Sequence, residues 1–152
     1  MKNIAIITFI LFLSHCGYSS IYKNQQSLDL QLNIIETKGD YEINNLIANQ
    51  IKLYSNKNSQ SIYDIKINTD YEKKVLTKNS SGVITDYNLS VISIFSINLK
   101  NKNKTFKFEE NINIKNQADT FEQKTYEKNI KRNFASSIRE KSISAILSIN
   151  DN

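Results

Sequence analysis

Hydrophobic and polar residues alternate in four separate stretches of this chain, and a period of two is typical of strands with one buried face. The four stretches are 28–35, 63–72, 84–99 and 106–114. In the third, Ile92 and Ile94 make the middle of the second face apolar too. We therefore expect this strand to be central in its sheet, or its second face to contact a partner.

Two further stretches repeat apolar residues every three or four positions, which predicts helices. The first covers about 41–55 and follows a candidate N-cap at Asp40. The second follows Asp119, where Glu122 completes a capping-box pattern, and continues for about 30 residues. Its apolar stripe is predicted to consist of Tyr126, Ile130, Phe134, Ile138, Ala145 and Ile149.

The order strand, helix, three strands, helix predicts an α+β fold, in which two helices pack on one face of a four-stranded mixed sheet. The helix between the first two strands implies a right-handed crossover, so these strands should be parallel. A polar turn at 100–104 should join the last two strands as an antiparallel hairpin. We expect a two-layer sandwich with the order β-α-β-β-β-α.

The N-terminus carries the pattern of an export signal. Lys2 is followed by an apolar run at 4–13, which is about ten residues long. A spanning helix needs roughly 20 apolar residues, so a cleaved signal peptide fits this run better than a membrane anchor.

The single cysteine, Cys16, follows this run, and with Leu13 and Ser14 it resembles the lipobox of bacterial lipoproteins. His15 stands where that pattern usually has a small residue. We predict a signal peptide at 1–15, a lipidated tether at 16–27 that starts with acylated Cys16, and one domain at 28–150. The alternative is a non-lipidated secretory signal that leaves an unpaired cysteine in an oxidising compartment.

The inventory of reactive side chains argues against catalysis. His15, the one histidine, would leave with the signal peptide, so the mature domain would hold neither Ser-His nor Cys-His pairs, nor histidine and cysteine ligands for zinc. Three widely spaced glycines provide no phosphate-binding loop. Glu109 and Glu110 are the one adjacent acidic pair, but on a strand they point to opposite faces. We expect no enzyme, no metal and no cofactor, with a carboxylate hydrolase as the weakest alternative.

The formal net charge is +5, and loss of Lys2 with the signal would leave +4. An exported protein is not expected to bind nucleic acid, so a functional charge would meet an anionic lipid surface or an acidic protein. The alternative is codon bias of an AT-rich genome, which also favours lysine, asparagine and isoleucine. Two lysine clusters are either solvated strand ends or sites for the phosphates of a glycolipid. They are Lys100, Lys102 and Lys104, and Lys73, Lys74 and Lys78.

The predicted mature start, Cys-Gly-Tyr-Ser-Ser-Ile-Tyr at 16–22, resembles that of the LptE family of lipopolysaccharide-assembly lipoproteins. Phe134-Ala135-Ser136-Ser137-Ile138 and Ala145-Ile146-Leu147 are similar to the family's closing helix, whereas Ser20 stands where a proline is common. The resemblance implies a lipid-anchored protein on the periplasmic side of the outer membrane. It also implies that the protein plugs an LptD-type translocon β-barrel and contacts lipopolysaccharide.

Two sets of side chains are candidates for these roles. The lysine clusters are candidates for the lipopolysaccharide phosphates, and Ile92 with Ile94 is the candidate contact with the protein partner. The alternative function is that of an accessory lipoprotein in another envelope assembly or lipid-transport machine.

Overall fold

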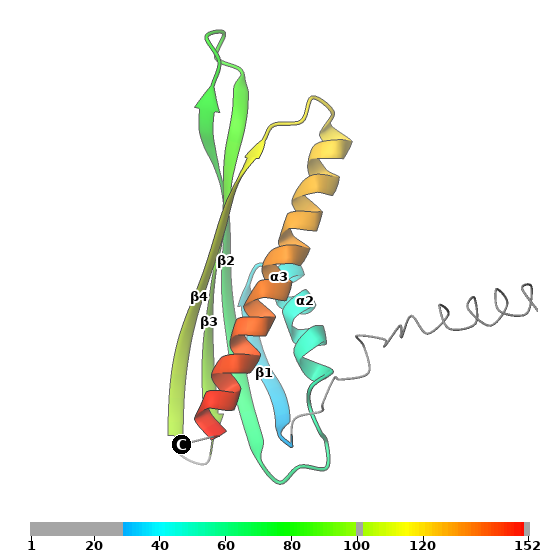
Figure 1. Cartoon of the computed structure of the whole chain (residues 1–152), viewed down its shortest axis with the longest axis vertical. Helices are drawn as coiled ribbons and strands as arrows, with labels where there is room; N and C mark the ends of the chain where they lie inside the picture. The colour runs from blue at the N-terminus through cyan, green and yellow to red at the C-terminus, as the bar shows by residue number, and fades with distance from the viewer. Residues whose placement is uncertain (1–28, 100–101, 151–152) are drawn as a thin grey trace, which may run out of the picture.

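The computed structural model describes residues 29–99 and 102–150, which form one sheet and two helices (Figure 1). The predicted signal peptide and tether, with Cys16, lie outside the described residues, and so does Lys100. The order of the elements confirms the prediction. They are β1 (Gln31–Gly39), α2 (Tyr41–Lys52), β2 (Ile62–Lys78), β3 (Ile84–Leu99), β4 (Lys102–Lys115) and α3 (Thr120–Asn150).

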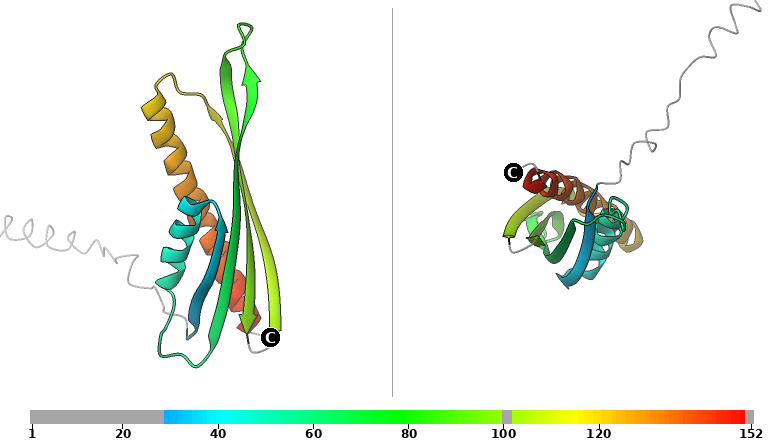
Figure 2. Two further views of the ribbon diagram at one scale, coloured as in Figure 1. Left: turned by 180° about the vertical axis from the view of Figure 1, so that it is seen from behind. Right: turned by 90° about the horizontal axis from the view of Figure 1, so that it is seen from below.

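The four strands form one mixed sheet in the order β1-β2-β3-β4. β1 and β2 are parallel, whereas β2 pairs with β3 and β3 pairs with β4 in antiparallel fashion. Both helices cover the same face of the sheet and leave the other face open (Figure 2). The two-layer α+β sandwich expected from the element order is therefore confirmed. Within the described residues, no helix has both the length and the apolarity needed to cross a membrane.

α2 begins where the sequence predicted, because its N-cap satisfies a free backbone donor. The Asp40 carboxylate accepts a hydrogen bond from the Ile43 amide at 2.9 Å. Ile43, Ile47 and Ile51 recur every four residues and are fully buried against the sheet. This single row of isoleucines fixes the side of α2 that faces the core.

The core lies between the inner face of the sheet and the two helices. Its largest fully buried members on the central strands are Tyr63, Ile65, Ile67, Leu89, Val91 and Phe95. Two hydroxyls are buried among them, and Thr69 Oγ1 lies 2.8 Å from Ser93 Oγ across β2 and β3. Since each hydroxyl is the other's partner, the pair avoids the penalty of an unsatisfied buried polar group.

The predicted apolar stripe of α3 is correct in its middle and wrong at its start. Ile130, Phe134 and Ile138 are buried, but Tyr126 is 39% exposed. In the first turns of α3, the residues turned toward the sheet are Gln123, which is buried, and Glu127, which pairs with Lys73 of β2, so Tyr126 lies off the covered side. The helix instead buries a row that includes two polar residues. The members of this row are Gln123, Ile130, Phe134, Ala135, Ile138, Ser142 and Ile146.

Two strands are longer than the alternation indicated. β2 continues from the predicted end at 72 to Lys78, because its backbone stays paired with β3 as far as Lys78↔Ile84. β4 already begins at Lys102, so the predicted turn at 100–104 is shorter than expected. Backbone pairing does not require an alternating side-chain pattern, and an edge strand tolerates lysine.

Candidate functional site

Ile92 and Ile94 lie on the open face of the sheet, because they alternate with the buried Val91, Ser93 and Phe95 of β3. Their cross-strand neighbours are polar. Ile92 pairs with Asp70 on β2 and Glu109 on β4, and Ile94 pairs with Asn68 and Lys107. Both isoleucines are half-buried by these neighbours. The open face is therefore a polar surface with a small apolar centre.

Two shallow hollows adjoin this apolar centre and share Lys66 and Ser96. One, of about 280 Å³, includes Ile94, and the other, of about 400 Å³, is lined by Lys104. Both are lined largely by lysine, amide and hydroxyl side chains. Such a lining can accept hydrogen bonds from, and donate them to, a polar or anionic ligand.

The lysines at the first hollow are partly neutralised by Glu36. Its carboxylate lies 2.7 Å from Lys38 Nζ and 3.1 Å from Lys66 Nζ. Hydrogen bonds from Lys38 and Lys66 hold the pKa of Glu36 below its usual value, and Glu36 in turn raises the pKa of Lys38. All three side chains keep substantial contact with water, so their mutual attraction is screened.

The cluster of Lys73, Lys74 and Lys78 does not form a patch of three free cations. Lys73 pairs with Glu127 of α3 and lies 4.0 Å above the ring of Tyr87. Lys74 pairs with Glu72 at 2.8 Å. These contacts give Lys73 a structural role between the sheet and α3.

Two further lysines of the clusters, Lys78 and Lys104, are far apart along the sheet. Lys78 is exposed at the end of β2, where it pairs in register with Ile84. Lys104 is exposed, pairs in register with Ile97 and lines the larger hollow. Lys102 opens β4, but its side chain lies outside the described part of the structure. Among the cluster lysines whose side chains are described, Lys78 and Lys104 are the exposed ones that have no acidic partner.

The adjacent acidic residues point to opposite faces, as alternation predicted. Glu109 pairs with Lys107 on the open face at 3.2 Å. Glu110 reaches α3 on the other face, where it accepts hydrogen bonds from Ser137 at 2.5 Å and Lys141 at 2.6 Å. The two carboxylates cannot serve as an acid and base on one substrate, because the sheet separates them. Among residues 29–99 and 102–150, no group of three metal-binding side chains lies together.

Glu110 couples the stability of the protein to pH. Burial raises the pKa of this carboxyl, but the hydrogen bonds from Lys141 and Ser137 and the charge of Lys141 outweigh burial and leave the pKa below its usual value of 4.5. A lowered folded-state pKa means that the contact stabilises the protein above about pH 4.5 and is lost as the pH falls through the folded-state pKa.

Glu110→Gln should therefore reduce the free energy of unfolding at pH 7 by on the order of 1 kcal/mol and flatten its decline below pH 4.5. Urea denaturation at several pH values measures both effects. Glu109→Gln is the matched control on the open face. It should change the free energy of unfolding by no more than about half a kcal/mol at any of these pH values. An equal response from the two variants would contradict the role assigned to Glu110.

Sequence reasoning did not anticipate the charged network that joins α2, α3 and β2. Lys131 Nζ lies 2.8 Å from Asp40 Oδ2, 3.4 Å from Glu42 Oε2 and 4.4 Å above the ring of Tyr71. Burial, followed by the charges of Glu127, Asp40 and Glu42, raises the pKa of Tyr71 to about 12. The sequence identified Asp40 as an N-cap, but residues 91 positions apart carry no signal that they meet.

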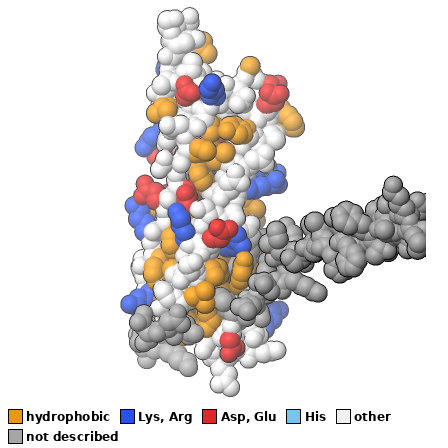
Figure 3. Space-filling view, in the orientation of Figure 1, with side chains coloured by type: hydrophobic (Ala, Val, Ile, Leu, Met, Phe, Trp, Pro, Cys, Tyr) orange, Lys and Arg blue, Asp and Glu red, His pale blue; other side chains and the backbone are white. Residues whose placement is uncertain are grey.

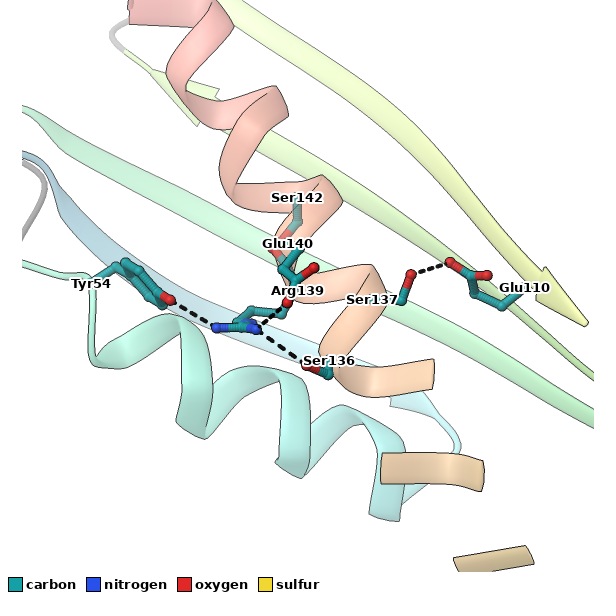
Figure 4. A network of polar contacts seen from close by, with 7 residues as sticks. All are labelled: Tyr54, Glu110, Ser136, Ser137, Arg139, Glu140 and Ser142. Carbon is teal, nitrogen blue, oxygen red and sulfur yellow. Dashed lines mark hydrogen bonds and ion pairs between the residues drawn. The ribbon is translucent and has the colours of Figure 1, made fainter. Parts of the chain in front are cut away.

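A second network holds the other end of α2 against α3 (Figure 4). Arg139 donates hydrogen bonds to Tyr54 Oη at 2.8 Å, to Ser136 Oγ at 3.2 Å and to Glu140 at 2.7 Å. The guanidinium spans the two helices, and its multiple donors suit this bridging role. Both networks fix the helices on the inner face of the sheet, so this face is covered and the opposite, open face is not.

The same fold occurs in solved structures of bacterial lipoproteins. Rare lipoprotein B from Shewanella oneidensis is 16% identical, with a TM-score of 0.59 over 79% of this chain and 98% of that chain. A candidate lipoprotein from Caulobacter crescentus is 9% identical, with a TM-score of 0.50 over 82% and 95% of the two chains.

Sequence comparison adds nothing to this structural likeness. No protein-family model matches the chain, and no curated protein matches it significantly. At these low identities the solved structures establish the fold alone. The fold is that of rare lipoprotein B, which supports the LptE-like fold that the resemblance implied.

Proposed function

We propose that this protein is an LptE-like lipoprotein of the outer membrane, which is anchored through acylated Cys16 and assembles inside an LptD-type translocon barrel. The observation that carries the proposal is the fold shared with 98% of rare lipoprotein B, at a TM-score of 0.59. The lipobox-like position of Cys16 and the resemblance at 16–22 support it independently of the fold. The role is to stabilise the barrel and to assist lipopolysaccharide assembly, not to catalyse a reaction.

The open face of the sheet is the proposed contact with the barrel. Its polar residues include both signs of charge, and Ile92 and Ile94 form its apolar centre. Barrel interiors are polar, so a plug needs a mostly polar surface with limited apolar anchoring. An apolar centre with a polar rim is also the usual anatomy of a protein interface.

Lipopolysaccharide phosphates are proposed to contact the lysines that remain accessible. Lys104 and Lys66 line the larger hollow beside amide and hydroxyl side chains, and Lys78 marks the distal end of β2. Lysine suits this role because its ammonium is a mobile point charge with three donors. Lys73 and Lys74 contribute less, because each already pairs with a glutamate.

The test is co-purification of the full chain from detergent-solubilised outer membranes. Ile92→Asp with Ile94→Asp should lose the barrel, because two desolvated carboxylates would replace the apolar centre of the interface. We expect at least tenfold less barrel recovered per unit of bait. Folding should survive, because neither side chain belongs to the buried core.

Asn45→Asp with Asn49→Asp is the matched control, since it introduces the same two charges at exposed positions of α2, on the opposite side of the molecule from the open face. Thermal melts of both variants separate lost binding from lost folding. Recovery of a large β-barrel with the wild type supports the proposal. Recovery of a different envelope assembly would replace it with the alternative of an accessory lipoprotein in another machine.

A further inference from the structure

The two edges of the sheet differ in their capacity to accept another strand. β1 is nine residues long, and its pairing with β2 shifts register between Ile34 and Glu36. β4 is 14 residues long, and its register with β3 runs unbroken from Leu99↔Lys102 to Asp86↔Lys115. Long, regular edges are templates for strand pairing, whereas irregular ones are protected.

No described element lies beyond the outer edge of β4. The strand is the last in the sheet order, and it runs along the left margin of the lower sheet (Figure 1). α3 contacts β4 from the inner face, through Glu110, and therefore does not cover this edge. The outer backbone groups of β4 are available to a further strand.

The side chains in the middle of β4 carry opposite charges at a spacing of two residues. Lys107 and Glu109 lie on the open face, opposite Ile94 and Ile92, and their side chains are 58% and 55% exposed. Between them Phe108 is half-buried and meets Phe95 edge to face, with 5.4 Å between the ring centroids. On the face turned to the viewer in Figure 3, charged residues of both signs are likewise interspersed.

This spacing is self-complementary under twofold symmetry. Two copies related by an axis perpendicular to the sheet would pair β4 antiparallel with its symmetry mate, with one residue on the axis. With Phe108 on the axis, Lys107 of each copy lies opposite Glu109 of the other. Opposite charges directly across an antiparallel pair are favourable, and the contact occurs twice.

Neighbouring registers lack this match. A residue on the axis lies opposite the same residue of the other copy. Registers centred on Lys107, Glu109 or Glu110 therefore place two like charges opposite each other. Phe106 on the axis leaves Lys107 opposite Thr105 and Glu109 opposite Asn103. In the register centred on Phe108, Thr105 lies opposite Asn111 and Asn103 opposite Asn113, which are neutral pairs that can hydrogen-bond.

The lysine at the start of the strand does not prevent this arrangement. Lys104 would lie opposite Ile112 of the other copy, a side chain that is 37% exposed in the single chain. The lysine stem can pack on that apolar surface while its ammonium stays in water. The two half-buried Phe108 side chains would meet at the axis as an aromatic cross-strand pair.

We propose that β4 is a homodimerisation edge, at which a second copy of this chain pairs antiparallel in the register centred on Phe108. The dimer has one continuous eight-stranded sheet with all four helices on one side. It leaves the open faces of both sheets uncovered and does not depend on the proposed barrel partner.

Disulfide trapping in the full-length protein, purified in detergent, tests the register. Lys107→Cys with Glu109→Cys places the new cysteines directly opposite each other across the axis, within the roughly 4.4–6.8 Å between Cα atoms that a disulfide needs. Mild oxidation should convert most of this variant to a covalent dimer. Oxidation of the protein without the new cysteines shows how much covalent dimer Cys16 itself forms.

Asn111→Cys with Asn113→Cys is the control, with two cysteines at the same spacing on the same face of the same strand. In the proposed register, the nearest approach between these positions of the two copies is about 20 Å, too far for a disulfide. The control should give little covalent dimer. Equal cross-linking of both variants, or an adduct with a different protein in place of the dimer, would overturn the proposal.

A second test needs no cysteines. It measures the monomer–dimer equilibrium of charge-reversed variants by sedimentation. Lys107→Glu and Glu109→Lys should each weaken the dimer roughly tenfold, because each puts like charges opposite each other twice. The combined swap restores opposite charges and should restore the dimer. A monomeric wild type, or single reversals that dimerise like the wild type, would contradict the proposal.

Discussion

Gly39→Ala is expected to reduce the free energy of unfolding by roughly 3 kcal/mol or more. Gly39 has a φ of +86°, a conformation that costs other residues about 1–2 kcal/mol. A Cβ at this position would lie 2.0 Å from the carbonyl oxygen of Thr69. The clash is with backbone, so no side-chain rotation relieves it.

The Thr69 carbonyl cannot easily withdraw from an added methyl group. It accepts a hydrogen bond from the Asp40 amide at 2.7 Å, which ties the end of β1 and the start of α2 to β2. Moving the carbonyl would break that bond and also disturb Asp40, the N-cap of α2. Urea denaturation of the purified protein measures the loss.

Gly82→Ala is the matched control. Gly82 also has a positive φ, +79°, but an added Cβ would meet nothing within 4 Å. Gly82→Ala should therefore cost only the free energy of holding alanine at a positive φ, about 1 kcal/mol. Equal losses for the two alanine variants would show that the close approach of Gly39 to Thr69 does not limit stability.

Phe95→Ala should lower the free energy of unfolding by about 3–5 kcal/mol, because it removes a large side chain from the centre of the core. Phe95 is fully buried on β3, a central strand of the sheet, and packs edge to face on Phe108 of β4. The surrounding sheet is held in register on both sides and cannot collapse to fill the cavity.

Phe121→Ala removes the same atoms from the exposed start of α3, where the side chain is 77% accessible. It should change stability by about half a kcal/mol or less. Guanidinium unfolding of both variants, followed by circular dichroism, gives the comparison. A loss at Phe95 no greater than that at Phe121 would contradict the assignment of the core.

Much of the architecture was readable from the residue pattern, because strands and helices leave different periods in a sequence. The alternation at 63–72 placed the buried face of β2 correctly, and the three-to-four-residue repeat at 41–55 did so for α2, whose Ile43, Ile47 and Ile51 are buried. Asp40 marked the start of α2, because few side chains can cap a helix. The residue pattern gave wrong predictions where tertiary contacts decide burial or strand length. Examples are Tyr126, which is exposed, and β2, which continues to Lys78.

The candidate site was less predictable than the fold. Sequence located Ile92 and Ile94 on the second face of β3, and the structure surrounds them with polar neighbours from β2 and β4. The lysine clusters looked uniform in sequence, yet Lys73 pairs with Glu127 of α3 and differs from exposed Lys78. Whether a lysine is free depends on which acidic residue lies beside it in space.

By itself, then, the sequence determined the element order, the buried faces and the absence of histidine from the domain predicted for the mature protein. These properties are local, since each depends on residues within one or two turns or strands. The tertiary structure alone decided that Lys131 meets Asp40, that Gly39 must lack a Cβ beside Thr69, and that β4 is an open edge. Those properties depend on contacts between distant segments, and pairing of that kind leaves no period along the chain.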